Sequence, residues 1–347
     1  MTRPATPPQV AVIVTCYNLG AYLDECLGSI AGAGFDAVEV VVVDDGSTQT
    51  DTLDRLQRLD TQHEARHGLD LRVLHQDNQG VSVARNTGIA AVATPYILPL
   101  DADDRLSPGF VEQAVRAMQA DDALGVVYGD VKRFGDEEDT WRLPAFDPVQ
   151  ILVNNFVPVT ALIRRSAWEA CGGFDSEVVS HEDWELWINL SGRGWTFRHL
   201  PVVALEYRAR PDSKVKMWDK PDVRRRLMRY VCRKHADLYR DHAVEVVTRK
   251  EIEKCELSNL VRELKAFVEE ADEQITEHAR SLQERIEFID KLTQAFRGLE
   301  AHSEALTRDL AARDDELRGI HATRWWRLAS WFARLKGESR PSDTNAC

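Results

Sequence analysis

Short apolar runs alternate with amphipathic segments in the part of the chain before Pro221. Continuous runs of Val, Ile and Leu predict buried strands at residues 10–15, 39–43, 71–74, 96–100 and 126–128. Apolar residues three or four apart predict helices at residues 21–30, 52–66, 81–93 and 108–120. Strands that alternate with helices predict an α/β fold, in which an open sheet is covered by helices on both faces.

A different pattern follows Pro221, after which the next proline is Pro341. From residue 275 to 320, fourteen positions follow alternating steps of three and four, and ten of them are apolar. The same rhythm runs from 257 to 271, and one extra residue between the two stretches indicates a stutter. The pattern predicts a coiled coil between copies of the chain. One long helix folded back onto the α/β part is the alternative.

These changes divide the chain into five predicted segments. They are a disordered N-terminus at 1–9, an α/β domain at 10–215, a helical linker at 216–250, the coiled coil at 251–320 and a tail at 321–347. The tail combines three Trp and one Phe with four basic residues between positions 323 and 336. A basic aromatic helix in an acidic protein predicts binding to a membrane surface. Docking onto a partner subunit or onto the α/β domain is the alternative.

Composition narrows the possible partners and the compartment. The 347 residues carry a formal net charge of −13, which makes a nucleic-acid backbone an improbable main partner. The six cysteines are scattered and form no CxxC pair, which is typical of free thiols in a cytoplasmic protein. No run of 18 apolar residues occurs, and residues 1–9 lack the apolar core of a signal peptide. We therefore expect a cytoplasmic protein, peripheral at the membrane.

Acidic residues follow two of the predicted strands. Asp44 and Asp45 follow the strand at 39–43, and Asp101, Asp103 and Asp104 follow the strand at 96–100. In an open α/β sheet, ligands bind beyond the carboxyl ends of the strands. Carboxylates gathered there repel one another unless a cation compensates them, and Mg²⁺ or Mn²⁺ often bridges carboxylates to a phosphate. Capping of a following helix is the alternative function for such residues.

Five short motifs occur in a fixed order along the α/β part. They are residues 15–18 (TCYN), 44–47 (DDGS), 78–86 (NQGVSVARN), 101–103 (DAD), and 172–175 (GGFD) with 181–187 (HEDWELW). This order and spacing, over residues 8–210, resembles the family 2 glycosyltransferases. The resemblance implies a GT-A fold, an open mixed sheet with a Rossmann-like nucleotide-binding half. It also implies inverting transfer from a nucleotide-diphosphate sugar to a glycan or lipid-linked acceptor in cell-surface polysaccharide synthesis.

The resemblance implies that five residues bind the nucleotide-sugar: Thr15, Tyr17, Asp45, Arg85 and Asp101. Thr15 and Tyr17 would form walls of the base pocket. Asp45, or Asp44 in its place, would accept a hydrogen bond from a uracil-type N–H. Arg85 would contact the base or a phosphate, and Asp101 would contact the ribose.

The catalytic and metal-binding roles also come from the resemblance. Asp183 would be the base that takes a proton from the attacking sugar hydroxyl, a task that suits a positioned carboxylate. Glu182 and Glu185 are its rivals. Asp103 would hold Mn²⁺ or Mg²⁺, which would stabilise the departing diphosphate.

Two features leave alternatives open. Arg210 stands where many relatives have a histidine that completes the metal site; an arginine cannot ligate a cation but can bind a diphosphate. Trp184 and Trp187 lie on one helical face, as a platform for an acceptor sugar or as core residues.

A catalytically weak coiled-coil scaffold of a polysaccharide-assembly complex is the alternative to an enzyme. A nucleotidyltransferase is disfavoured, because residues 15–20 lack a basic, glycine-rich loop.

Overall fold

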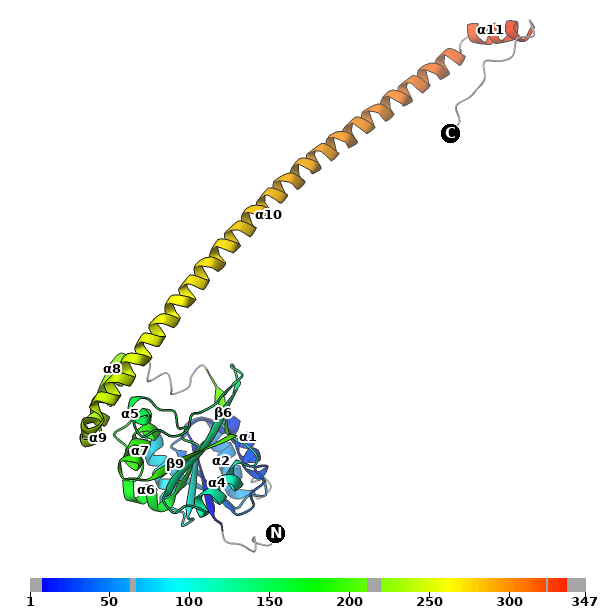
Figure 1. Cartoon of the computed structure of the whole chain (residues 1–347). Helices are drawn as coiled ribbons and strands as arrows, with labels where there is room; N and C mark the ends of the chain where they lie inside the picture. Colours follow the sequence, from blue (N-terminus) through cyan, green and yellow to red (C-terminus); the bar gives the residue numbers. More distant parts are fainter. Residues whose placement is uncertain (1–7, 63–66, 211–219, 323, 336–347) are drawn as a thin grey trace. The chain divides into compact units, whose positions relative to one another are not determined.

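The computed structural model describes residues 8–62, 67–210, 220–322 and 324–335 (Figure 1). The chain divides into two compact units, Met1–Cys255 and Glu256–Cys347. Most of the predicted N-terminal segment, residues 1–7, and the end of the tail, residues 336–347, lie outside the described residues.

The first unit is built on one mixed sheet of nine strands. Eight strands follow the order β3-β2-β1-β4-β8-β6-β9-β5, and β7 pairs with β6. The strands are β1 Val10–Cys16, β2 Val38–Asp45, β3 Leu71–Gln76, β4 Tyr96–Asp101, β5 Arg105–Leu106, β6 Leu124–Gly135, β7 Asp139–Trp141, β8 Leu162–Arg164 and β9 Thr196–Ala209. The first four strands along the chain run parallel, whereas β8 is antiparallel to both of its neighbours. The predicted open mixed α/β sheet is confirmed.

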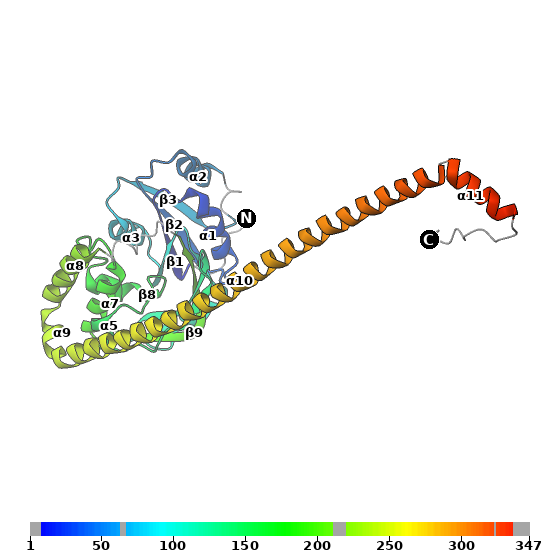
Figure 2. The same ribbon diagram turned by 90° about the horizontal axis from the view of Figure 1, so that it is seen from above.

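Helices cover both faces of this sheet. In chain order, the helices among the described residues of both units are α1 Gly20–Ala31, α2 Thr50–Thr61, α3 Val81–Ala90, α4 Phe110–Gln119, α5 Gln150–Val153, α6 Arg165–Cys171, α7 Glu182–Gly192, α8 Pro221–Lys234, α9 Ala236–Asp241, α10 Ala243–Ala322 and α11 Arg324–Leu335. Alternate residues of β1 pack into two cores, one with α1, α2 and α4 and the other with α3 and α7. Figure 2 shows α1 and α3 on opposite sides of β1.

Close packing of α3 on the sheet depends on a glycine. A Cβ atom at Gly88 would lie 2.5 Å from Cγ2 of Ile13 in β1, which no side chain could tolerate without movement. The glycine therefore brings α3 directly against the central strand. This contact places the first turns of α3, which carry Arg85 and Asn86, near the carboxyl ends of β1 and β4.

The second half of the sheet differs from the prediction. The predicted strand at 126–128 is part of the 12-residue strand β6, and the 14-residue strand β9 was not predicted. Eight of the twelve residues of β6 are buried, but they include Gly125, Gly129 and Asp130, and the last four are partly or fully exposed. β9 contains Pro201 and mixed polar residues. Neither stretch has the continuous apolar pattern of a central strand.

The stretch predicted as a linker contains α8, α9 and the first turns of α10. Leu227 and Val231 of α8 are buried in the first unit. Glu253 of α10 accepts hydrogen bonds from Gln150 (3.0 Å) and Asn154 (3.1 Å). The first unit therefore ends a turn beyond residue 250, inside α10 rather than before it.

The second unit consists of the rest of α10 and of α11. At least half of the surface of its heptad residues Leu282, Ile289, Phe296 and Leu310 is exposed in the single chain. In α11, the rings of Trp331 and Phe332 lie edge to face, with centroids 5.2 Å apart, and both are exposed. Among the described helices, none is long and apolar enough to cross a membrane. The coiled coil and the membrane contact remain predictions; the side chains of Trp325 and Trp326 lie outside the described part.

Candidate active site

The carboxyl ends of three parallel strands meet at one edge of the sheet. The register pairs Thr15 of β1 with Asp101 of β4, and Cys16 of β1 with Asp44 of β2. The hydroxyl group of Thr15 donates a hydrogen bond to Oδ1 of Asp101 over 3.1 Å. Tyr17, which follows directly, is 40% exposed at the same edge. The structure thus brings together three of the predicted nucleotide-binding residues.

Arg85 connects this edge to α7. Its side chain is 2% exposed; Nη2 lies 2.8 Å from Oδ1 of Asp101, and Nη1 donates to Oε1 of Glu182. A buried guanidinium needs such partners, because an unpaired charge inside a protein costs several kcal/mol. Arg85 therefore positions two carboxylates with respect to each other. The sequence predicted only a contact of Arg85 with the base or a phosphate, and not this positioning role.

Asp183 lies in the first turn of α7, one residue after Glu182. The helix begins after His181, which adopts the left-handed conformation (φ 57°). Oδ2 of Asp183 accepts a hydrogen bond from the Asn155 amide (3.0 Å), and Oδ1 accepts one from the Trp184 backbone (2.8 Å). Burial, together with the neighbouring Glu182 charge, raises the pKa of Asp183 to about 7. A carboxylate with this pKa is suited to accept a proton near neutral pH.

The three acidic residues of α7 occupy different environments. Glu182 is engaged with the buried Arg85, whereas the hydrogen bonds described for Asp183 come from neutral donors. Glu185 has no exposed surface and contacts Nε2 of His235 (2.7 Å) and Nζ of Lys234 (2.9 Å). Glu185 therefore does not fit the role of the catalytic base, because no acceptor hydroxyl could reach a carboxylate enclosed in this way. Asp183 is the carboxylate whose environment fits a base.

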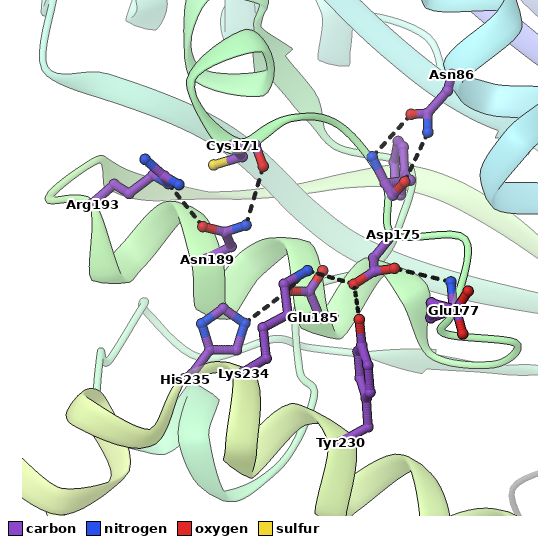
Figure 3. Close-up of polar contacts among 11 residues, drawn as sticks. Asn86, Cys171, Asp175, Glu177, Glu185, Asn189, Arg193, Tyr230, Lys234 and His235 are labelled. Atoms are coloured by element: carbon purple, nitrogen blue, oxygen red, sulfur yellow. Dashed lines mark hydrogen bonds and ion pairs between the residues drawn. The ribbon is translucent and has the colours of Figure 1, made fainter.

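Glu185 belongs to a polar cluster that ties α8 to α7 (Figure 3). Lys234, at the end of α8, also contacts Asp175 over 2.5 Å, and the Tyr230 hydroxyl donates to the same carboxylate over 2.8 Å. Burial raises the pKa of Asp175, but the hydrogen bonds from Lys234, Glu177 and Tyr230 outweigh it and leave the pKa below its usual range. Through Glu185, the cluster holds the helix that carries the candidate base.

Asn86 holds the loop that leads to α7. Its amide nitrogen donates to the Phe174 carbonyl (2.7 Å), and its Oδ1 accepts from the Phe174 backbone (2.9 Å), as Figure 3 shows. Gly173 has a φ of 84°, and a Cβ atom there would lie 2.7 Å from the Asn86 oxygen. The GGFD motif is therefore a turn that only glycine allows, closed on the NQGVSVARN motif.

Asp44 and Asp45 are both buried anchors of loops. Asp45 accepts hydrogen bonds from the backbone of Gln79 and of Gly80 (both 2.9 Å) and from the Gln76 amide (2.8 Å). Asp44 accepts one from the Ser47 backbone (2.9 Å) and contacts His75 (3.0 Å). The predicted bond from a nucleotide base to Asp45 would have to share a carboxylate that already fixes the start of α3.

The predicted metal ligand Asp103 is paired with an arginine. Nη2 of Arg210 lies 2.7 Å from Oδ2 of Asp103, and both side chains are largely buried. Burial and the Asp101 charge raise the pKa of Asp103, against the opposing effect of Arg210. Among the described residues, no group of three or more His, Cys, Asp and Glu side chains could hold a metal ion. This donor set does not fit the Mn²⁺ or Mg²⁺ expected from the motif, because a cationic side chain sits on the one predicted ligand.

Trp184 and Trp187 are core residues. Trp184 is 4% exposed and Trp187 is fully buried. The indole nitrogen of Trp187 donates to the Val157 carbonyl over 3.0 Å, and that of Trp184 donates to the Ile151 carbonyl. Both hydrogen bonds lie inside the second core, so neither ring offers a surface on which an acceptor sugar could stack.

Comparison with known proteins shows which proteins this chain resembles. Residues 11–174 match the model of Glycosyl transferase family 2. The chain is 28% identical to chondroitin synthase of Escherichia coli over 197 residues, 56% of this chain and 28% of that protein. It is 34% identical to the glycosyltransferase GlyG of Streptococcus pneumoniae over 133 residues, 38% of this chain and 41% of that protein. The chain thus spans well under two thirds of the length of these relatives.

Solved structures show the same fold. The crystal structure of Staphylococcus aureus TarS 1–349 in complex with UDP-GlcNAc superposes with a TM-score of 0.52 at 21% sequence identity. The superposition covers 63% of this chain and 65% of that one. The mixed sheet and the helices packed on it in the first unit therefore have the same architecture as that structure.

Proposed function

We propose that this protein is an inverting glycosyltransferase of family 2, whose model matches residues 11–174. The donor in this proposal is a nucleoside diphosphate sugar, bound at the carboxyl ends of β1, β2 and β4. The observation that carries the proposal is Asp183, a carboxylate with a pKa raised to about 7, next to an ion pair between Arg85 and Glu182 that connects it to Asp101.

The chemistry needs one base and one displacement. Asp183 takes the proton from a hydroxyl group of the acceptor while the oxygen of that group attacks the anomeric carbon. The bond from that carbon to the diphosphate breaks, and both bonding electrons leave with the diphosphate. Attack from the face opposite the leaving group inverts the anomeric centre. Glu182 does not take a proton in this scheme; with Arg85 it positions the first turn of α7.

The relatives support a polysaccharide as the product class. Chondroitin synthase is named for a polysaccharide, and TarS was solved with UDP-GlcNAc. We propose that the acceptor is a glycan or a lipid-linked glycan in cell-surface polysaccharide synthesis. In the donor site, Thr15, Tyr17 and Asp101 would contact the nucleoside.

The second unit supports a proposal about assembly and place. The heptad residues of α10 are exposed in one chain, and a second copy in register would cover them. In α11, the exposed Trp331 and Phe332 accompany the basic residues Arg327 and Arg334. Such a helix lies in the headgroup region of an anionic bilayer and binds it reversibly. We propose that a coiled-coil oligomer brings several of these helices to one membrane that holds the acceptor.

A screen of donors tests the proposed activity. The protein is incubated with UDP-, GDP- and dTDP-linked sugars, and release of the nucleoside diphosphate is measured with and without a mixture of glycan acceptors. Thermal unfolding is recorded in parallel, because a bound donor raises the melting temperature by mass action. Turnover of one donor that Asp183→Asn abolishes supports the enzyme. Binding without turnover under every condition would favour the scaffold instead.

A further inference from the structure

Arg210 and Asp103 lie together because of the pairing between β5 and β9. These strands are antiparallel, with Arg105 opposite Glu206. Residues after β9 therefore lie beside residues that precede β5, which are those of the DAD motif. The result is that a cationic side chain 107 positions away in the sequence reaches the second aspartate of the motif.

Arg208 fixes this arrangement. Its backbone nitrogen donates to Oδ1 of Asp104, and its Nε donates to the carbonyl oxygen of Asp103, both over 2.8 Å. The guanidinium groups of Arg208 and Arg210 both lie over the ring of Tyr22, at 4.8 and 5.3 Å from its centroid. The cation at Arg210 is thus held by an ion pair, an aromatic ring and a clamped backbone, not by a solvated surface contact.

A departing diphosphate needs positive charge close to its oxygens. A divalent ion at Asp103 would supply it, but the Arg210 guanidinium occupies the position next to that carboxylate. Arginine stays protonated at every physiological pH, and its planar fork matches phosphate oxygens in a bidentate manner. Its Nη2 bonds Asp103 in this structure, and the five N–H donors of a guanidinium allow one side chain to bond a carboxylate and phosphate oxygens together.

We propose that Arg210, anchored by Asp103, takes the place of the divalent cation and binds the diphosphate of the donor, so that donor binding and transfer do not require a metal ion. This inference rests on the proposed function and gives Asp103 a different role from the one that its motif implies. Asp103 holds the arginine instead of a metal.

Binding of UDP and of GDP to the full chain tests the inference. Isothermal titration calorimetry is carried out in EDTA and again in excess MnCl₂, and turnover of the donor found in the screen is measured under both conditions. For the wild type, we expect binding in EDTA, with an affinity that Mn²⁺ changes less than about threefold. Arg210→Ala should lower the affinity about ten- to a hundredfold with or without Mn²⁺, as expected for a charge-assisted bidentate contact.

Arg210→His gives the sharpest result. A histidine beside Asp103 restores a pair of metal ligands, so we expect weak binding in EDTA and recovery of at least about tenfold in Mn²⁺. Arg198→His is the matched control: it lies at the other end of β9, pairs with Asp121 over 3.2 Å and is half-exposed, and it should change nothing.

Three results would overturn the inference. One is a wild type that binds a nucleoside diphosphate only when Mn²⁺ is present. Another is an Arg210→Ala variant that binds as well as the wild type in EDTA. If neither nucleotide binds under either condition and no donor turns over, the proposed function fails together with the inference.

Discussion

Arg85 and Glu182 form an ion pair inside the first unit that joins α3 to the first turn of α7. Arg85 is also bonded to Asp101, so the pair connects the end of β4 to the helix that carries the candidate base. Glu182 and Asp183 are adjacent in the sequence, but this pair gives them different tasks. The carboxylate of Glu182, held by the buried cation, fixes the helix, and Asp183 is the candidate that would accept a proton.

Substitution of the two residues should separate these tasks. Asp183→Asn should lower kcat by about two to four orders of magnitude, the usual effect of losing a general base, and should leave binding of the nucleoside diphosphate unchanged. Glu182→Gln should lower the melting temperature, because Arg85 then keeps only one of its two anionic partners. Steady-state kinetics and calorimetry on both variants check this. An active Asp183→Asn enzyme with an inactive, stably folded Glu182→Gln enzyme would reverse the assignment.

The raised pKa of Asp183 predicts how activity depends on pH. Below pH 7 the carboxyl group is protonated and cannot act as a base, so kcat should fall about tenfold per pH unit below a midpoint near 7. A profile of kcat against pH, with UDP binding measured over the same range as a control, gives the midpoint. A midpoint near 4, the usual value for an aspartate, would contradict the assignment.

The raised pKa of Asp183 also predicts how the stability of the protein depends on pH. Its pKa is higher in the folded protein than in the unfolded chain, so the folded state binds the proton more tightly. Its contribution to the free energy of unfolding therefore falls as the pH rises from about 4 to about 7. Asp183→Asn carries no charge and should melt at a higher temperature than the wild type at about pH 8, but not at about pH 4. Differential scanning calorimetry of both proteins at the two pH values gives the melting temperatures that test this prediction.

Much of this site could be predicted from the sequence, because strand ends and motifs are local signals. The parallel strands β1 to β4 and the positions of Asp101 and Asp103 follow from short apolar runs and their flanking residues, whereas Asp183 was predicted only through the resemblance of its motif to a family. The partners could not be predicted. Arg85 and Glu182 are 97 positions apart, and no local pattern states that one meets the other. Arg210 was visible as a departure from the motif, but its contact with Asp103 depends on the register of β9, a strand with no clear apolar pattern.

Substitutions in the polar cluster between α7 and α8 should cause a large loss of stability. The double substitution Lys234→Met and His235→Leu leaves the fully buried Glu185 without the Lys234 cation and without the His235 ring nitrogen, and breaking a buried ion pair costs about 3–5 kcal/mol. Adding Glu185→Leu should recover part of this loss. Urea unfolding followed by tryptophan fluorescence measures both effects. Arg233→Met, on the same helix but exposed, is the control and should stay within about 0.5 kcal/mol of the wild type. Equal stability of all these variants would show that the cluster contributes little.

The heptad residues of α10 predict the oligomeric state. Leu282→Glu with Ile289→Glu should dissociate the oligomer, since both residues are more than half exposed in one chain and would be buried between copies. Gln283→Glu with Thr293→Glu adds the same charge at neighbouring positions and should leave the oligomer intact. Multi-angle light scattering gives the mass of each. A monomeric wild type would support the helix that folds back instead.

The aromatic residues of α11 predict membrane binding. Trp331→Ala with Phe332→Ala should lower co-sedimentation with vesicles that contain phosphatidylglycerol by about tenfold, because these rings suit the headgroup boundary. Ser330→Ala is the control on the same helix. Vesicles of phosphatidylcholine alone should bind the wild type weakly, as attraction of the basic residues requires anionic lipid. Undiminished pelleting of the double variant would point to docking on a protein.

Arg85 and Asn86 are consecutive residues, and each forms hydrogen bonds with a residue far away in the sequence. One reaches Glu182, 97 positions later, and the other holds the backbone of Phe174, 88 positions later. A graft that takes the segment 172–192 from another glycosyltransferase would therefore meet two side chains that no longer match it. For the design of chimeric enzymes, residues 80–90 and 172–192 are one exchangeable module, although strands β4 to β8 lie between them in the sequence.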